Sequence, residues 1–329
     1  MTNKAAIFNY LPNLSLPWIN LVNSPTPFYK LNKIGEHFNF QSIWIKTDGN
    51  AGELFGGNKL RNLEFLLATA KNANASAVIT FGSIESNYAL AIAKYGQALK
   101  IKVKLYLCNL SNSKSNELKP FIEKLKETGA EIVIIPKMFC FLLNELSRKN
   151  INIYFSKSAY VIPIGGANSI GCIGHINSVL ELNEQLTENK ISSPVTIILP
   201  VGSGGTIAGL IAGFTLLKVK INIVGIYISN GPSKSRILDL AKKTLLKINC
   251  KNKIDQALIG IELNDKFKGD GYRKSTIQSN LILKVFSDLE NIHLDETYAA
   301  KAASAIEGVI NHDRTRAIIF WHTSNCKFI

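Results

Sequence analysis

The sequence predicts an α/β protein of two domains, each a mostly parallel, twisted β-sheet covered by helices. Short runs of apolar and β-branched residues alternate with amphipathic segments along most of the chain, which is typical of parallel strands joined by helical crossovers. About nine strands are expected, and a continuous core stops growing at roughly 250–300 residues. A chain of 329 residues therefore favours two sheets over one.

The periodicity of the apolar side chains places the individual elements. Expected strands lie at 42–46, 77–81, 101–108, 131–135, 195–199, 222–228 and 317–321. Expected helices lie at 60–67, 86–99, 115–128, 138–149, 172–188, 206–217, 233–247, 274–288 and 296–310. Residues 55–165 form one run of strand–helix units, so we expect a small domain there. Residues 1–54 and 166–329 would together form a larger domain.

The composition indicates a basic, folded protein and excludes several classes. There are 38 Lys and Arg against 24 Asp and Glu, a net charge of +14. Only 6 of the basic residues are Arg and the lysines are dispersed, which favours a solvated surface over a nucleic-acid interface. No apolar run reaches the ~18–20 residues that cross a bilayer, and no signal peptide is evident. The 5 cysteines form no CxxC pair, so we expect reduced thiols in a cytoplasmic protein and no metal site.

The segment GGNKLRNLEFLL contains a candidate reactive lysine. Gly56 and Gly57 form a flexible turn that leads directly into a helix. Asn58 is the expected N-cap, because its side-chain oxygen can accept an unpaired amide hydrogen. Lys59 then lies in the first turn, where the helix dipole lowers the pKa of a lysine. That suits a Schiff-base lysine, although an ordinary first-turn lysine is the commoner case.

A second junction between a strand and a helix carries two polar residues. Gly82 turns the chain after the strand at 77–81, and Ser86 and Asn87 open the next helix. Ligands of open α/β sheets bind at the carboxyl ends of parallel strands. The pair therefore either contacts a ligand or only caps the helix.

A glycine-rich junction follows the strand at 195–199 and is the most specific signal. Its residues are Gly202, Ser203, Gly204, Gly205 and Thr206. Glycines let backbone amides surround an anion, and the following helix adds its positive dipole end. No lysine follows the glycines and the pattern is not GxGxxG, so neither a nucleotide P-loop nor a dinucleotide site is indicated. A small phosphate group is favoured over a purely structural turn.

Three more polar side chains lie in the last quarter of the chain. Tyr272 follows a glycine-rich loop, and Thr323 lies just beyond the final strand. Tyr298 lies in the first turn of a predicted helix that Asp295 or Thr297 would cap. Each is ordinary by residue type, since a tyrosine near a helix start usually serves packing.

Together these segments resemble a known family. GGNKLRNLEFLL, GSIESNY, IPIGGANSIGCIGHI, VGSGGTIAGL, LDETYAAKA and WHT occur in the order seen in pyridoxal-phosphate (PLP) enzymes of the tryptophan-synthase-β fold, fold type II. The chain is similar to the D-cysteine desulfhydrase and 1-aminocyclopropane-1-carboxylate (ACC) deaminase group over residues 24–324. The resemblance implies PLP in the cleft between two domains and a small amino acid as substrate. It also implies a homodimer. The dispersed charge and the lack of a long apolar run leave neither nucleic acid nor membrane as an expected partner.

The resemblance implies a role for each matching cofactor residue. Lys59 matches the lysine that binds PLP covalently, and Asn87 matches the asparagine that binds the 3′-hydroxyl of the ring. Residues 202–206 match the phosphate loop. Thr323 matches a hydroxyl near the pyridine nitrogen.

Four residues would act in catalysis by the same resemblance. Lys59 would serve as the base at Cα, and Ser86 matches a serine near the substrate carboxylate that takes part in proton transfer. Tyr272 and Tyr298 match two tyrosines that face the substrate. The implied reaction is β-elimination, with D-cysteine as the first expectation, giving pyruvate, hydrogen sulfide and ammonia.

The chain departs from the family at three places, and these keep two alternatives open. Tyr88 stands where the family commonly has His, and Ser324 replaces the last Gly of a HisThrGly motif. Ala299 stands where ACC deaminases have Glu, which would keep the pyridine protonated. Ala299 therefore disfavours ACC deaminase, which remains one alternative. The other is a divergent PLP-binding protein with little turnover.

Overall fold

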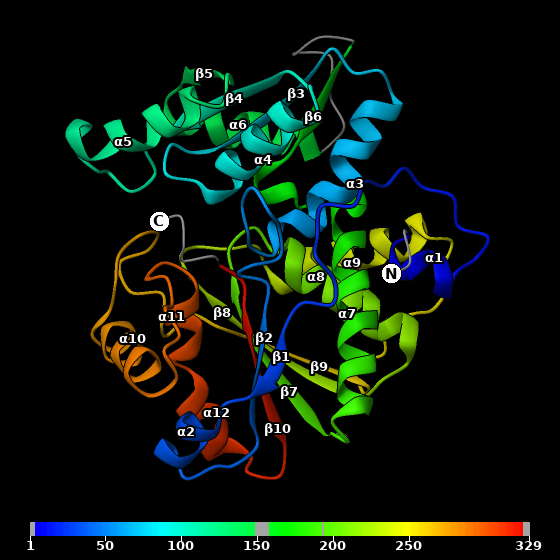
Figure 1. Ribbon diagram of the computed structural model, residues 1–329, viewed down its shortest axis with the longest axis vertical. Helices are drawn as coiled ribbons and strands as arrows, with labels where there is room; N and C mark the ends of the chain where they lie inside the picture. Colours follow the sequence, from blue (N-terminus) through cyan, green and yellow to red (C-terminus); the bar gives the residue numbers. More distant parts are fainter. Residues whose placement is uncertain (1–3, 149–157, 193, 325–329) are drawn as a thin grey trace.

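The computed structural model describes residues 4–148, 158–192 and 194–324. They form two sheets (Figure 1), one of six strands in the order β1-β2-β10-β7-β8-β9 and one of four strands in the order β5-β4-β3-β6. Neighbouring strands are parallel everywhere except between β1 and β2. The predicted α/β class with two mostly parallel sheets is therefore confirmed.

The strands lie within short segments of the chain. They are β1 (Phe28–Lys30), β2 (Ile43–Thr47), β3 (Ala77–Ser83), β4 (Val103–Cys108), β5 (Glu131–Ile134), β6 (Ala159–Ile162), β7 (Val195–Val201), β8 (Ile221–Tyr227), β9 (Ile259–Asn264) and β10 (Ala317–His322). The helices are α1 (Ala6–Tyr10), α2 (Asn32–His37), α3 (Lys59–Asn72), α4 (Asn87–Ala98), α5 (Ser115–Lys126), α6 (Lys137–Arg148), α7 (Ser169–Glu188), α8 (Gly205–Leu217), α9 (Lys234–Lys247), α10 (Ile277–Glu290), α11 (Ala299–Ala303) and α12 (Ile306–His312). A single 3₁₀ turn covers Ile164–Gly166.

Both faces of the six-stranded sheet are covered by helices. Helices α7, α8 and α9 pack on one face, and α2, α10, α11 and α12 pack on the other (Figure 1). Successive side chains of β10 alternate between the two cores, with Ile319 on the α7–α9 face and Ile318 on the opposite one. A strand buried on both faces needs a continuous apolar run, which explains the sequence of β10.

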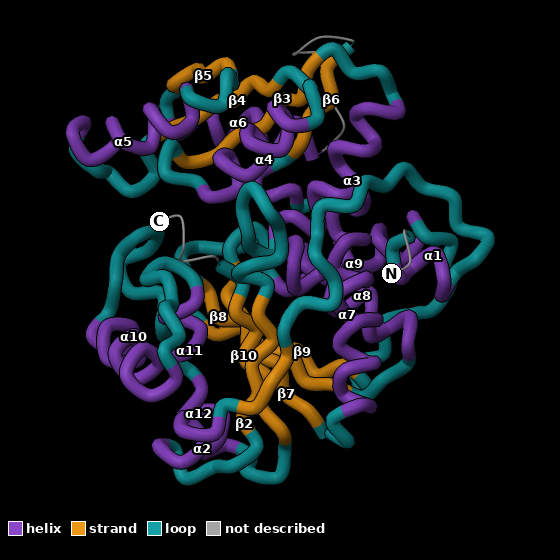
Figure 2. Tube along the Cα trace, in the orientation of Figure 1, coloured by secondary structure: helices purple, strands orange, loops and turns teal. Residues whose placement is uncertain are grey.

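The four-stranded sheet is covered in the same way by fewer elements (Figure 2). Val78 of β3 packs in a core with α3, α4 and α5, while Ile79 packs with α6 on the other face. Helix α3 belongs to both halves of the molecule, since Phe65 packs in the core of the large sheet and Leu63 in that of the small sheet. The first turn of α3, which starts at Lys59, therefore lies between the two sheets.

Some elements differ from the prediction. The single helix expected at 296–310 is two short helices, α11 and α12, which break at Ser304 and Ala305. Strands β1, β6 and β9 were not predicted. They are 3, 4 and 6 residues long, and all three are edge strands, so a strong apolar period is absent. No helix in the described part of the chain is long and apolar enough to cross a membrane.

Candidate active site

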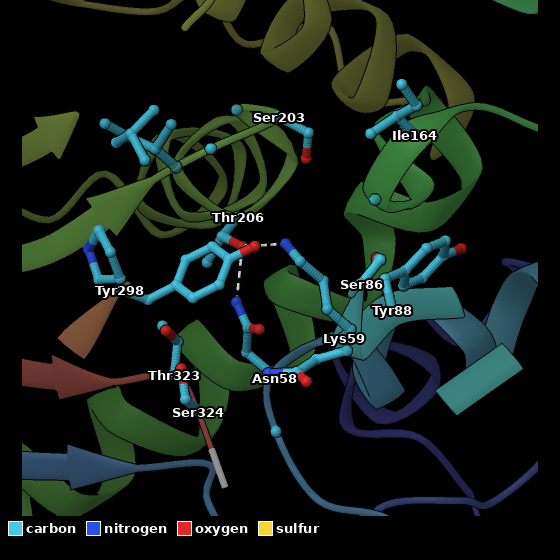
Figure 3. A pocket seen from close by; sticks show the side chains of 18 of the residues that line it. Asn58, Lys59, Ser86, Tyr88, Ile164, Ser203, Thr206, Tyr298, Thr323 and Ser324 are labelled. Carbon is cyan, nitrogen blue, oxygen red and sulfur yellow. Dashed lines mark hydrogen bonds between the residues drawn. The ribbon is translucent and has the colours of Figure 1, made fainter. Parts of the chain in front are cut away.

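A pocket lies between the two sheets, where strands of both sheets end. Its wall is formed by residues that follow β3, β6, β7 and β10 and by the first turns of α3, α4 and α8 (Figure 3). The predicted residues on it are Lys59, Ser86, Asn87, Gly202, Ser203, Gly204, Thr206, Tyr298 and Thr323. Gly205 lies behind this wall, and Tyr272 lines an adjoining cavity that shares Ser86, Gly202, Ser203 and Tyr298 with it. The fold thus brings together predicted site residues that lie as far apart in the sequence as Lys59 and Thr323. This is expected where parallel strands end at the same edge of a sheet.

Lys59 presents its amine to this pocket. Its Nζ donates a hydrogen bond to Thr206 Oγ1 at 3.2 Å (Figure 3). Burial lowers the pKa of Lys59 from 10.5 to about 8, because desolvation disfavours the ammonium. The lowered pKa was expected from the helix dipole, whereas the main cause is burial. A larger share of the lysine is therefore a neutral amine, the form that attacks a carbonyl carbon.

Asn58 does not cap α3, so that prediction is wrong. Its backbone is already helical, with φ −59° and ψ −19°, and its side chain makes no capping bond. Instead Asn58 Nδ2 donates to Thr206 Oγ1 at 2.8 Å, and its backbone N–H donates to Thr323 O at 2.9 Å. Asn58 therefore joins the start of α3 to the glycine-rich loop and to the end of β10.

The glycine-rich loop has the features of an anion cradle. Gly204 adopts a φ of +83° at the N-cap of α8, a 13-residue helix, and a Cβ there would lie 2.7 Å from Pro232 Cγ. Ser203 Oγ is buried and has no hydrogen-bond partner among the described residues. Thr206 Oγ1 accepts two N–H groups and keeps its own proton to donate. An unpaired hydroxyl beside a helix N-terminus fits a phosphate group.

Residues at the start of α4 cap the helix and also form part of the pocket wall. Ser86 Oγ accepts the backbone N–H of Ala89 at 3.2 Å, so the capping interpretation holds, and Ser86 also lines the pocket. Tyr88 also lines the pocket, with its ring directed away from the Lys59 amine (Figure 3). Its hydroxyl is buried without a partner among the described residues, and burial raises its pKa well above 10. A Cβ on Gly166 would lie 2.7 Å from this hydroxyl, so it faces the 3₁₀ turn at Ile164–Gly166.

The two candidate tyrosines contact each other at the opposite side. The rings of Tyr272 and Tyr298 meet edge to face with centroids 6.2 Å apart. Asp295 accepts the backbone N–H groups of Tyr298 at 2.6 Å and Ala299 at 3.0 Å, which confirms it as the cap of this turn. Burial raises the pKa of both tyrosines, so both are neutral hydroxyls near pH 7.

Carboxylates are absent from the described wall of the pocket, and Lys59 is its one ionisable cation. Ala299 is fully buried and does not reach the wall. Thr323 and Ser324 supply neutral hydroxyls at the end of β10. Across the described chain no cluster of three or more His, Cys, Asp or Glu side chains could hold a metal ion.

Sequence reasoning missed a buried cluster of charges under α3. Arg61 Nη2 lies 2.7 Å from Asp48 Oδ1 and Arg61 Nη1 lies 3.2 Å from Glu181 Oε2. Lys46 also pairs with Glu181, and all four side chains are buried. Arg61 lies two positions after Lys59 in the same helical turn, so the cluster fixes the base of the turn that presents the lysine. No local pattern marks a charge as buried, so the sequence offered no signal.

Comparisons with known proteins agree with this geometry. A family profile described as "Pyridoxal-phosphate dependent enzyme" matches residues 19–317. A Thermotoga maritima protein, provisionally named 1-aminocyclopropane-1-carboxylate deaminase, is 32% identical over 93% of this chain and 95% of its own length. A Klebsiella pneumoniae protein named D-cysteine desulfhydrase is 31% identical over 95% of each chain. The crystal structure of an ACC deaminase homologue superposes with a TM-score of 0.78 and 27% identity, covering 98% of this chain and 95% of its own. The chain therefore belongs to the family of pyridoxal-phosphate dependent enzymes, and its fold is that of fold type II.

Proposed function

We propose that this chain catalyses β-elimination from a small D-amino acid, with D-cysteine as the first substrate to test. One D-cysteine and one water would give one pyruvate, one hydrogen sulfide and one ammonia. The proposal is supported by the resemblance to proteins named D-cysteine desulfhydrase and by the uncharged wall around Lys59.

We assign the cofactor contacts as follows. Lys59 would hold PLP covalently, Asn87 would bind its 3′-hydroxyl, and Thr323 would lie near its pyridine nitrogen. Gly202, Ser203, Gly204, Gly205 and Thr206 would bind its phosphate. The unpaired Ser203 hydroxyl and the left-handed Gly204 support the last assignment. Bound PLP withdraws electrons from the substrate Cα.

The remaining groups would move protons and hold the substrate. Lys59, with its lowered pKa, would take the proton from Cα. Ser86 would lie near the substrate carboxylate, and Tyr272 and Tyr298 would face its β-carbon side. Because both tyrosines stay protonated, they can donate to a departing sulfur.

The single observation that carries the choice of reaction is the missing carboxylate on the described wall. A carboxylate beside the pyridine nitrogen would keep it protonated and make the stronger electron sink. A neutral hydroxyl, as in Thr323, gives a weaker sink. That suits β-elimination, in which a good leaving group departs at once, better than the opening of a cyclopropane ring.

ACC deamination is the second candidate, because one relative carries that name provisionally. A PLP-binding protein with little turnover is the third, because Tyr88 stands on the pocket wall where the family commonly has His. One screen separates the three. PLP-loaded protein is assayed with D-cysteine, β-chloro-D-alanine, D-serine, their L-forms and ACC for keto-acid release, with Lys59→Ala as the matched inactive control.

Release of pyruvate from D-cysteine, with little 2-oxobutanoate from ACC, is the expected result. A higher kcat/KM for ACC would replace the first proposal with the second. Absence of turnover with every amino acid, in protein that binds PLP, would favour the third.

We further propose that the chain works in the cytoplasm as a homodimer, that it binds neither nucleic acid nor membrane, and that residues 55–165 form its small domain. The four cysteines in the described part of the chain are free, which supports a reducing compartment. The four-stranded sheet lies wholly within residues 77–162, which supports the domain boundary. Sedimentation of the PLP-loaded protein tests the dimer.

A further inference from the structure

Lys301 is a buried cation, and the hydrogen bonds of its amine within the described chain all go to backbone carbonyls. Its side chain is fully buried, and Nζ donates to Ile228 O at 3.0 Å, Lys268 O at 2.6 Å and Gly271 O at 2.7 Å. No carboxylate of the described residues lies within ion-pair distance of it. An ammonium carries three N–H donors, so the three carbonyls use all of them.

The three carbonyls come from two segments that are far apart in the sequence. Ile228 follows β8 and packs beside Gly202 of the glycine-rich loop. Lys268 and Gly271 belong to the loop that leads to Tyr272. Lys301 thus ties this loop to the end of a central strand.

Lys301 and Tyr298 belong to the same short helix, so their positions are coupled. Lys301 is the third residue of α11, and Tyr298 occupies the N-cap position of the same helix. A helix fixes the spacing of residues three apart, so the ammonium and the Tyr298 ring move as one unit. The loop that Lys301 holds therefore places Tyr272 against Tyr298, at 6.2 Å between ring centroids.

Two glycines make this loop costly to order, so contacts from outside the loop must hold it. Gly269 has a φ of +56° and Gly271 a φ of +112°, and glycine loses more conformational freedom on ordering than other residues. On its far side the loop reaches the small sheet, where Arg273 pairs with Glu85 at 2.9 Å. The loop thus spans the space between the two sheets, and Lys301 holds its other end.

Burying the charge of Lys301 costs free energy, which indicates that its three hydrogen bonds have a role. Burying an ammonium without an ion-pair partner in contact is unfavourable. Burial lowers the pKa of Lys301 to about 8, and the more distant charge of Asp270 offsets only part of that effect. An apolar residue of the same length would pack without that cost but could not hold three carbonyls. The cost is consistent with a role in geometry rather than in packing.

We propose that Lys301 is a positioning residue, whose three hydrogen bonds set the place of Tyr272 relative to Tyr298 at the substrate side of the pocket. This inference rests on the proposed function only in that the two tyrosines are taken to face the substrate. Lys301 itself does not line the pocket.

The test compares Lys301→Met with Lys268→Met in the PLP-loaded protein. The first variant removes all three donors at nearly constant length. The second changes a half-buried side chain of the same loop, removes only its ion pair with Asp265, and keeps the Lys268 carbonyl. We expect Lys301→Met to lower kcat for D-cysteine about tenfold to a hundredfold, the size of effect that a misplacement of ~1 Å produces. The Kd for PLP should change less than about threefold, and Lys268→Met should match the wild type.

A double-mutant cycle with Tyr272→Phe separates positioning from general damage. If Lys301 acts through Tyr272, the double variant loses no more than about twofold beyond the worse single variant. Losses that multiply would overturn the proposal, as would a Lys301→Met variant with wild-type kcat. Lys301→Gln, which keeps two donors, should lie between the wild type and Lys301→Met.

Backbone hydrogen exchange tests the role of Lys301 independently of whether the protein turns over D-cysteine. Exchange should rise selectively at residues 268–274 in Lys301→Met and not in Lys268→Met. If the wild type turns over no amino acid, the proposed function fails, and this exchange pattern still decides on Lys301. Uniformly faster exchange, or failure of both Lys301 variants to fold, would assign the residue to global stability and overturn the proposal.

Discussion

The lowered pKa of Lys59 has a measurable consequence for the stability of the protein without PLP. In the folded chain this pKa is about 8, against a usual value of 10.5. Between these two values the unfolded chain binds more protons than the folded one, so the free energy of unfolding rises with pH across that window. Below pH 8 the whole cost of burying the ammonium is present, and above pH 10.5 none of it remains.

The size of the cost follows from the shift. One pKa unit corresponds to about 1.4 kcal/mol, so the shift of Lys59 corresponds to at most about 3 kcal/mol. Replacing Lys59 by Met removes the cost. At pH 7 we expect Lys59→Met to unfold with a free energy up to about 3 kcal/mol higher than the wild type, with the difference shrinking toward zero near pH 10.5.

Urea denaturation of the PLP-free proteins at pH 7 and at pH 10 measures this difference. The control is Lys71→Met, an exposed lysine in the last turn of the same helix, for which a change within about 0.5 kcal/mol is expected at both pH values. If Lys59→Met stabilises the protein equally at pH 7 and pH 10, or no more than Lys71→Met does, the lysine is not held near pKa 8 and the argument for its reactivity fails.

Three further predictions concern the same region. Borohydride reduction followed by peptide mapping should place a covalent PLP label on Lys59, and a label on another lysine would refute that assignment. Gly204→Asp should weaken PLP binding at least about a hundredfold, because it adds strain, bulk and negative charge to the cradle, whereas Gly129→Asp, also at positive φ but in open space, should bind PLP like the wild type in a titration. Arg61→Met should lower the free energy of unfolding by about 3–5 kcal/mol in urea, because it leaves Asp48 buried without its partner, and a loss below about 1 kcal/mol would contradict the buried pairing.

Features that depend on neighbouring residues could be predicted from the sequence. The glycine-rich turn before α8 needs a left-handed backbone at Gly204. Glycine adopts that conformation readily, so its presence in the sequence predicts the turn. Ser86 caps α4 and Asp295 caps the turn at Tyr298, both as the local patterns indicated. The two sheets followed from the alternation of strands and helices, because apolar periodicity is also a local signal.

Features that depend on distant residues could not be predicted. Asn58 looked like a cap, yet its amide bonds to Thr206, which lies 148 positions away. Arg61 pairs with Glu181 across 120 positions, and Lys301 reaches carbonyls 30 to 73 positions away. The residue type alone does not show whether a charged side chain is buried or exposed, because burial depends on contacts with distant parts of the chain.

The charges around the pocket also restrict the side chain of the substrate. The wall around Lys59 presents the positive end of α8 and the lysine amine, and no carboxylate of the described residues lines it. The adjoining cavity beside Tyr272 contains Glu145, but that carboxylate already pairs with Arg148 and Arg236. A substrate whose β-substituent is an ammonium would lose its hydration there without gaining a counter-ion, which is unfavourable. We therefore expect D-2,3-diaminopropionate to show a kcat/KM at least about a hundredfold below that of β-chloro-D-alanine, which corresponds to about 3 kcal/mol of lost stabilisation. Steady-state assays of pyruvate release at pH 7 compare the two. Comparable values would mean that an acidic group reaches the pocket, and the argument from its uncharged wall would then be wrong.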